Sequence, residues 1–436
     1  MRQPRSRARR ARVIATLAAG TLVLAACSNA TTATAAHSAA APGVSAHTVD
    51  VGSLATASGP LASGFGEITA GVKAYFDMVN AQGGVDGRRL VLAHQGDDEG
   101  SPSLDTDVAR TLVTQDHVFA IVGVATPFFT ASTYLRQQGT PTFGDVVSTD
   151  WANAPNLFGT FGSYLDVGSV GPEAAFVAQK VGATAAAVIA YPIAQSQQAC
   201  RAEVDALQAA GVPVPVVDLN FVPGGNVVPD VTQMKAHHVD FLVSCMEAPD
   251  SLSFARAMRQ YGIGRFHALW LTGYSQQTVR DNPTLTNDVV FIEQHVPFEA
   301  ATAFPGRYPG MARYLATMKK YEPRWAYDGT ALQGWINAAQ FVAGLRAVKG
   351  ALTQQKLVAA INAERGFTAG GLMTPINWST AHTSAPPPNC VSFVEAHDGS
   401  LAPAFLAHPG QVYDCFGRSG DRTVAPPPGT PGTSGS

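Results

Sequence analysis

Apolar positions along the chain alternate between short continuous runs and stripes at helical spacing. The run Val49 to Leu54 predicts a strand, and Ile68, Val72, Phe76 and Val79 then recur at intervals of four, four and three residues, which places them on one face of a helix. A second strand is expected at Arg89 to His94. A strand, a helix and a strand in this order predict a right-handed parallel unit, with any ligand at the carboxyl end of the first strand, where residues 56–65 lie.

The same alternation continues to about residue 272. Ser101 and Pro102 begin a helix whose buried stripe is expected at Leu104, Val108 and Leu112. Further strands are expected at 119–124, 141–143, 185–190, 214–219, 239–245 and 268–272, with helices at 129–138, 196–210, 231–236 and 252–261. Later helices are expected at 309–321, 327–348 and 353–362. The pattern predicts an α/β protein with two doubly wound parallel-sheet lobes, since 436 residues exceed the roughly 250 to 300 at which single cores stop growing.

Three motifs in the first unit identify a family. They are Ser58-Gly59-Pro60-Leu61-Ala62, then Asn80-Ala81-Gln82-Gly83-Gly84-Val85-Asp86-Gly87-Arg88, then Asp97-Asp98. In this order and spacing they resemble the opening of the type I periplasmic binding proteins, and within these the branched-chain amino-acid-binding family. The glycines serve equally well as turn and helix-cap residues, so they indicate the fold and not a ligand contact.

The resemblance implies two discontinuous lobes joined by a hinge of three crossings, near residues 163–168, 293–298 and 370–378. Lobe 1 is expected to comprise residues 48–165 and 296–372, and lobe 2 residues 166–295 and 373–416. Residues 371–405, with Trp378, resemble the closing β segment on the second lobe. Residues 417–436, rich in Pro, Gly and Ser, have no means of forming a core and are expected to be disordered.

The N-terminal sequence is typical of an export signal. Six arginines precede the apolar run Val13 to Ala26, and Leu24-Ala25-Ala26-Cys27 resembles a bacterial lipobox, which implies acylation of Cys27 after removal of residues 1–26. An ordinary secretory cleavage site beside a cysteine is the alternative. Residues 27–47 are then expected to be a flexible tether to the outer face of the cell membrane. Loss of the six arginines changes the formal net charge from −3 to −9, which argues against a nucleic-acid partner.

Four cysteines remain after Cys27, and their even number in an exported protein predicts two disulfides. Three pairings are possible. Cys200 with Cys245 and Cys390 with Cys415 are favoured, because each bond would join neighbouring pieces of one lobe. A metal site is disfavoured, since no two of these cysteines are close in sequence.

The resemblance also implies ligand-binding positions on the first lobe. The family holds a ligand carboxylate with hydroxyls and backbone N–H groups at places that correspond to Ala125, Thr126, Ser148 and Thr149. Helix capping is the alternative role for the hydroxyls of Thr126 and Ser148. Phe65 is a candidate for contact with the apolar part of a ligand.

The second lobe departs from the family pattern. An aromatic-glycine step is replaced by Tyr191 to Gln197, which include Ser196, and the place of an acidic residue is taken by Thr272-Gly273-Tyr274-Ser275. An ammonium group buried without an anion costs several kcal/mol, so an ordinary amino-acid ligand is in doubt. Glu247 is the candidate substitute, with a solvated position at a helix start as its alternative. Tyr191, Gly273 and Tyr274 are expected to line the same cleft.

These features predict a monomeric solute-binding lipoprotein without cofactor or metal. It would close its lobes on a small ligand and deliver it to the permease and ATPase of an ABC importer. A ligand sensor on the same fold is the alternative, and a permease and ATPase encoded beside the gene would favour import. Enzymatic activity is not expected, because the chain has no Gly-x-Ser-x-Gly elbow, no His-Glu-x-x-His helix and no P-loop after a strand.

Overall fold

The computed structural model describes residues 41–165, 171–384 and 389–417. The predicted signal peptide, Cys27 and the tail beyond residue 417 therefore lie outside the described residues. Residues 41–47, the described end of the predicted tether, are packed against the fold, since Ala41 and Val44 contact the core and Gly43 accepts a hydrogen bond from the Asp50 N–H at 2.7 Å. The folded part of the chain thus begins earlier than the sequence indicates.

The first lobe contains a five-stranded parallel sheet in the order β2-β1-β3-β4-β5. Its strands are β1 (Thr48–Ala55), β2 (Arg89–Asp97), β3 (Ile121–Ala125), β4 (Thr142–Gly144) and β5 (Leu157–Gly159). Its early helices are α1 (Ile68–Asn80), α2 (Pro102–Thr114) and α3 (Ser132–Gln138), and the chain later returns to it with α10 (Pro309–Tyr321), α11 (Gly329–Ala347) and α12 (Gln354–Asn362).

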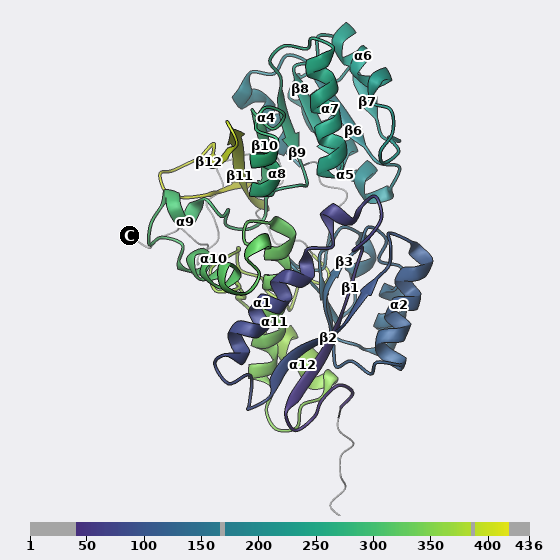
Figure 1. Ribbon diagram of the computed structural model, residues 1–436, viewed down its shortest axis with the longest axis vertical. Coiled ribbons are helices and arrows are strands. Elements are labelled where there is room, and N and C mark those ends of the chain that lie inside the picture. Colours follow the sequence, from purple (N-terminus) through teal and green to yellow (C-terminus); the bar gives the residue numbers. More distant parts are fainter. Residues whose placement is uncertain (1–40, 166–170, 385–388, 418–436) are drawn as a thin grey trace, which may run out of the picture. The chain divides into compact units, whose positions relative to one another are not determined.

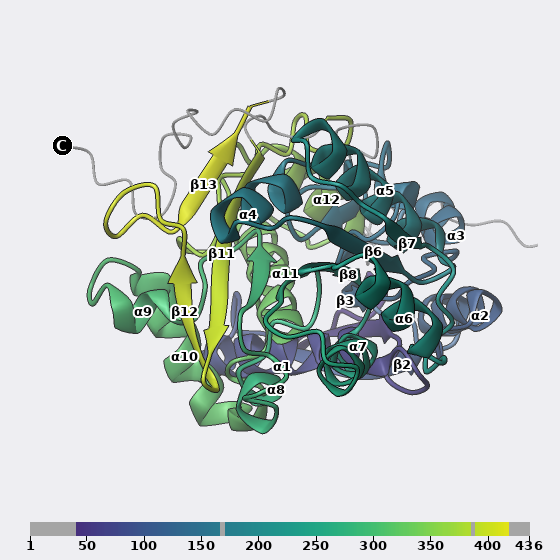
Figure 2. The same ribbon diagram turned by 90° about the horizontal axis from the view of Figure 1, so that it is seen from above.

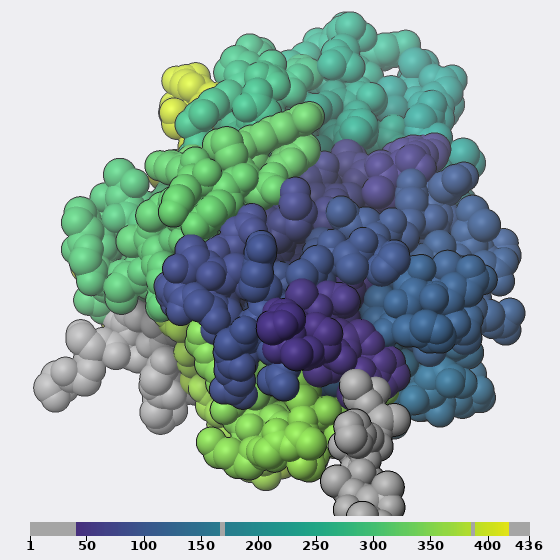
Figure 3. Space-filling model, turned by 60° about the horizontal axis from the view of Figure 1, so that its bottom comes forward, coloured from purple at the N-terminus to yellow at the C-terminus, as the bar shows by residue number. Residues whose placement is uncertain are grey.

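Helices cover both faces of this sheet, with α1 and α11 on one face and α2 on the other (Figure 1). Alternate residues of the strands serve the two faces: Val51 and Val122 belong to the core beneath α1 and α11, whereas Leu54 and Ile121 belong to the core beneath α2 and α3. Because both faces of the sheet are buried, the sequences of its strands are continuous apolar runs. In Figure 3 the purple-blue start of the chain and the green returning helices adjoin on the surface, as the packing of α1 on α10 and α11 requires.

The predicted buried faces of the first two helices, α1 and α2, agree with the structure to different degrees. Ile68, Val72, Phe76 and Val79 are all buried on α1, as predicted. The prediction for α2 is confirmed only in part: Leu112 is buried, but Leu104 is exposed, Val108 is half-buried, and Asp105 and Ala109 are the other buried residues. The first turn of the helix differs because the Asp105 carboxylate accepts hydrogen bonds from the Ala131 N–H at 2.6 Å and the Thr130 hydroxyl at 2.9 Å, which turns this polar residue inward.

The second lobe contains an eight-stranded sheet in the order β12-β11-β10-β9-β8-β6-β7, with β13 also paired to β11. The parallel strands are β6 (Ala186–Ala190), β7 (Val216–Asp218), β8 (Phe241–Cys245), β9 (His267–Trp270) and β10 (Val289–Glu293). The antiparallel strands β11 (Asn389–His397), β12 (Ser400–Ala404) and β13 (Tyr413–Phe416) close one edge, as Figure 2 shows in yellow. The helices are α4 (Glu173–Val181), α5 (Ala194–Ala209), α6 (Val228–Ala236), α7 (Ala248–Gln260) and α8 (Gln276–Asp281), with α9 (Ala300–Ala303) after the second crossing.

The α/β fold with two doubly wound lobes is therefore confirmed, but the third crossing falls later than expected. Trp378 was expected on the second lobe. It packs instead on Phe158 of β5, with ring centroids 5.1 Å apart, and the second-lobe strand β11 begins only at Asn389. The reason lies in contacts distant in sequence, since Phe158 and His382 both stack near the Trp378 ring.

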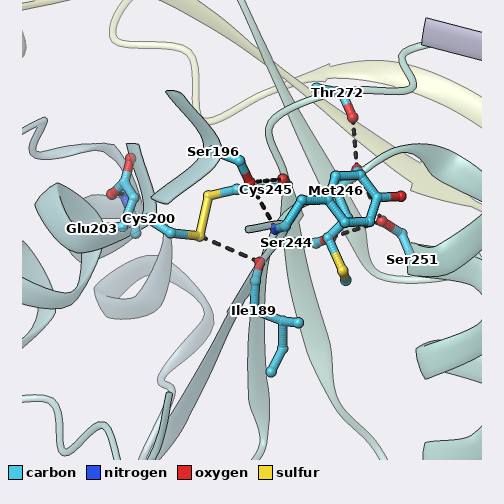
Figure 4. The surroundings of a disulfide bond; sticks show 11 residues. Ile189, Ser196, Cys200, Glu203, Ser244, Cys245, Met246, Ser251 and Thr272 are labelled. Atoms are coloured by element: carbon cyan, nitrogen blue, oxygen red, sulfur yellow. Dashed lines mark hydrogen bonds between the residues drawn. A yellow bond between two sulfur atoms is a disulfide. The ribbon is translucent and has the colours of Figure 1, made fainter. Parts of the chain in front are cut away.

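Both disulfides of the second lobe have the favoured pairing, Cys200 with Cys245 and Cys390 with Cys415. The first bond ties α5 to the carboxyl end of β8 (Figure 4), and the second ties β11 to β13. Among the helices of the described residues, none has both the length and the apolar character that crossing a membrane requires.

Candidate interlobe binding site

The hydroxyl groups at the strand ends of the first lobe are held by a buried carboxylate. Asp98 is fully buried and accepts hydrogen bonds from the Thr56 hydroxyl at 2.6 Å, from the Thr126 hydroxyl and from the Gly100 N–H at 2.9 Å. Thr126 therefore neither caps α3 nor presents a free hydroxyl. Its contact with a ligand remains a prediction.

Ser148 and Thr149 lie in the loop after β4. The Ser148 side chain accepts a hydrogen bond from the Asp150 N–H and donates one to the Asp150 carboxylate at 2.9 Å, so it caps the short 3₁₀ helix Thr149–Trp151. This is the capping role that the sequence left open. Thr149 itself is exposed.

Two other predicted residues of the first lobe belong to its core. Phe65 is 8% exposed and packs among the buried residues beneath α1 and α11. Ala125 ends β3, is fully buried, and accepts a hydrogen bond from the Thr56 N–H at 2.9 Å. Their contact with a ligand remains a prediction.

Tyr191 and Ser196 are bound to other groups of the second lobe. The Tyr191 hydroxyl donates to the Asp250 carboxylate at 2.6 Å, and burial followed by this neighbouring carboxylate raises the pKa of Tyr191 far above its usual value. The Ser196 hydroxyl donates to the carbonyl of Cys245 at 2.6 Å and accepts from the Tyr191 N–H at 2.9 Å. Figure 4 shows Ser196 beside this carbonyl and Thr272 beside the carbonyl of Met246, to which it donates at 2.7 Å.

Tyr274 is fixed at the second crossing. Its hydroxyl donates to the Glu299 carboxylate at 2.5 Å and accepts from the Phe298 N–H at 2.9 Å, and its ring stacks on Phe298 with centroids 4.8 Å apart. Gly273 has a φ of +84°, and a Cβ there would lie 3.0 Å from that of Ala248. The close approach of Gly273 to Ala248 therefore holds the hinge segment against the start of α7.

Glu247 differs from all the residues above. It follows β8 at the N-cap position of α7, makes no capping hydrogen bond, and is only 6% exposed. Its Oε2 has no hydrogen-bond partner. The solvated alternative is thus wrong, because the first lobe covers this side chain: a Cβ on Gly64 would lie 2.1 Å from Oε2.

Three further acidic residues were not predicted from the sequence: the charges of Glu67 and Asp145 act on Glu247, and the charge of Glu67 acts on Asp328. Glu67 stands at the N-cap of α1, Asp145 directly after β4, and Asp328 at the N-cap of α11. Their positions could have revealed them, since all three follow a strand or begin a helix. In a doubly wound fold such positions converge on one edge of the sheet. We call Glu67, Asp145, Glu247 and Asp328 the interlobe acidic group.

The fold and this interlobe region define a two-lobed ligand-binding protein, and comparison with known proteins identifies its family. The family model described as periplasmic binding protein matches residues 48–400, so the chain belongs to that family. No curated protein matches the chain.

Solved structures share the fold at low sequence identity. A fatty acid ABC transporter substrate-binding protein from Thermomonospora curvata is 18% identical, with a TM-score of 0.68 over 86% of this chain and 95% of that one. A solute-binding protein from R. palustris in complex with benzoate is 19% identical, with a TM-score of 0.66 over 83% and 97%. The branched-chain amino acid transporter substrate-binding protein from Streptococcus pneumoniae in complex with isoleucine is 18% identical, with a TM-score of 0.65 over 82% and 98%.

The resemblance found in the sequence is therefore confirmed at the level of the superfamily. The chain is a periplasmic binding protein with the two-lobed fold of that family.

Proposed function

We propose that this protein is a monomeric lipoprotein, anchored through Cys27, that captures a small polar or amphipathic solute between its lobes and delivers it to an ABC importer. One observation carries the binding step. The segments that follow β1 and β8, on different lobes, meet where the Glu247 carboxyl lies against Gly64. A ligand held there touches both lobes and so favours the conformation in which they are together.

The binding step is tested with the solute that co-purifies with the protein, identified by mass spectrometry and returned to the emptied protein. The ligand should raise the unfolding temperature by linkage, and small-angle scattering should show a monomer whose radius of gyration decreases at saturation. A radius that stays constant while the unfolding temperature rises would contradict closure but not binding.

The lipid anchor is tested separately. With the wild-type sequence the protein should fractionate with membranes, and Cys27→Ala should prevent acylation and leave it out of the membrane fraction. Cys27 acylation is read directly from the mass of the N-terminal peptide. Membrane association that survives Cys27→Ala would contradict the anchor and leave the binding step untouched.

A further inference from the structure

The loop that carries Glu247 is held rigidly from the second lobe. The Cys245 carbonyl accepts from Ser196 at 2.6 Å, the Met246 carbonyl accepts from Thr272 at 2.7 Å, and the Ser251 hydroxyl bonds to that of Ser244 at 2.7 Å. The disulfide from Cys245 to Cys200 adds a covalent tie two residues before Glu247. The Glu247 carboxyl is therefore directed at the first lobe by its surroundings.

The first lobe places further carboxyls around it. Burial, followed by the charges of Glu67, Asp145 and Asp250, raises the pKa of Glu247 to about 8. Burial and the charge of Glu293 raise the pKa of Asp145 to about 7, and burial and the charge of Glu67 raise that of Asp328 to about 7. Acidic groups thus face one another from both lobes.

Within the described residues no cation forms an ion pair with this group, and the more distant charge of Arg324 only lowers the pKa of Glu67 against the larger effect of burial. Among the described residues, no Lys, Arg or His lies within 4.0 Å of a carboxylate of the interlobe acidic group. Asp328 accepts from the Ala331 N–H at 3.0 Å and the Gln333 amide can donate to Asp145 at 2.8 Å, but Oε2 of Glu67 and Oε2 of Glu247 have no partner. Leaving a buried carboxylate oxygen without a hydrogen-bond partner is costly, so these two oxygens call for a donor that the described residues do not supply.

The spacing of these groups disfavours a single metal ion. Among the described residues, the one trio of His, Cys, Asp or Glu whose ligand atoms lie within 4.8 Å of one another is His267, Asp288 and Glu395, and no member of the interlobe acidic group belongs to it. The carboxyls are therefore too dispersed to coordinate one ion together, and they suit a larger cation that reaches several of them.

We propose that the ligand captured between the lobes is a small organic cation whose ammonium or amidinium groups bind Glu247 from the second lobe and Glu67 and Asp145 from the first. The inference rests on the proposed solute-binding function and specifies its substrate class. Such a ligand supplies the missing hydrogen-bond donors and charge, and it links the lobes electrostatically. An anion at this place would face several carboxylates once they are ionised, so a simple carboxylate is expected to bind more weakly than an amine.

Four probes of equal carbon length test the proposal: 1,4-diaminobutane, 1-aminobutane, butanoate and 1-butanol. Isothermal titration and thermal unfolding are measured at pH 9, where the Glu247 carboxyl is ionised and the amines are still largely protonated. The diamine should bind most tightly, the monoamine more weakly, and butanoate and butanol should produce no shift. Equal or tighter binding of butanoate would overturn the proposal.

Glu247→Gln keeps the size of the side chain and removes its charge. It should weaken binding of the diamine about 30-fold, since one partner of a buried charge pair is lost. Asp107→Asn removes an exposed carboxylate of α2, which lies 3.8 Å from the Arg110 guanidinium, and it should leave the affinity unchanged. Diamine binding that is equal in Glu247→Gln and wild type would place the cation elsewhere and overturn the assignment.

The outcomes separate this inference from the proposed function. If the co-purified solute is anionic or neutral and binds with closure, the protein is a solute-binding protein and the cation assignment is wrong. Absence of binding by both amines also overturns the cation assignment, and the proposed function is then judged by the co-purified solute alone.

Discussion

Two buried carboxylates stand at strand ends on opposite lobes, and their surroundings differ completely. Asp98, after β2, is fully buried and accepts three hydrogen bonds, from Thr56, Thr126 and Gly100. Glu247, after β8, is 6% exposed and has an Oε2 without any partner. The first carboxylate is satisfied by its own lobe, whereas the second is covered by the other lobe without being satisfied.

This difference separates a carboxylate that stabilises the fold from the carboxylate that we propose binds the ligand. A network in which every donor and acceptor is paired stabilises the fold and loses stability when any member is removed. An unpaired buried carboxylate destabilises the fold and keeps its interaction energy available for a ligand. The two residues should therefore respond to mutation with opposite signs.

The largest expected effect is that of Asp98→Ala. This change removes the common acceptor of two hydroxyls and one N–H in a buried site, and it should lower the free energy of unfolding by about 4 kcal/mol. Denaturant unfolding followed by circular dichroism measures it. The matched control is Asp107→Ala on the exposed side of α2, which should change the free energy by less than about 0.5 kcal/mol. A loss at Asp98 no larger than at Asp107 would contradict the structural role.

The fold could be predicted from the sequence because its signals are local. The α1 stripe Ile68 to Val79 and the turn glycines Gly83 and Gly84 are read within a few residues of one another. The α2 stripe and the place of Trp378 failed for the opposite reason, since they depend on Asp105 bonding Ala131 and on Trp378 packing against Phe158. The three-residue strand β5 was missed, although the equally short strands β4 and β7 were predicted.

The candidate site was predictable in place but not in chemistry. Glu247 was named from its position after a strand, yet its burial depends on Gly64, which lies far away in the sequence. The hydroxyls of Thr126 and Ser196 were named for the same reason, and their partners Asp98 and Cys245 come from other segments. A residue type at a strand end therefore indicates that a group faces the site, whereas its availability depends on tertiary hydrogen bonds.

The comparison of Asp98 with Glu247 can be tested further by measuring how the stability of the wild type and of Glu247→Gln depends on pH. The folded pKa of about 8 exceeds the value of 4.5 usual for a glutamate, so the folded protein retains a proton that the unfolded chain releases. The unfolding free energy of the ligand-free wild type must then fall as the pH rises from about 5 to about 8, and Glu247→Gln should lose about 3 kcal/mol less over this interval. Denaturant unfolding at a series of pH values measures both slopes.

Other carboxyls facing Glu247 keep part of this slope in the variant. Asp145 and Asp328 titrate with a pKa of about 7, and the pKa of Glu67 is also raised by burial. The expected result is therefore a shallower slope and not a flat one. Identical slopes in the two proteins would show that Glu247 is ionised in the folded state throughout and would remove the contrast with Asp98.

The smallest expected effect on stability is that of Gly64→Ala, which acts on the contact between the lobes. The new Cβ would lie 2.1 Å from Glu247 Oε2, so the lobes must separate or the carboxyl must move. Neither lobe loses a core contact, and we expect the unfolding free energy to change by at most about 1 kcal/mol.

The radius of gyration of the unliganded protein should increase, as measured by small-angle scattering. In Gly64→Ala/Glu247→Ala the shortened side chain removes the clash, and the radius should return to the wild-type value. An increase that persists in the double variant would mean that Gly64 meets another part of the second lobe, and that the Glu247 carboxyl is not what limits the approach of the two lobes.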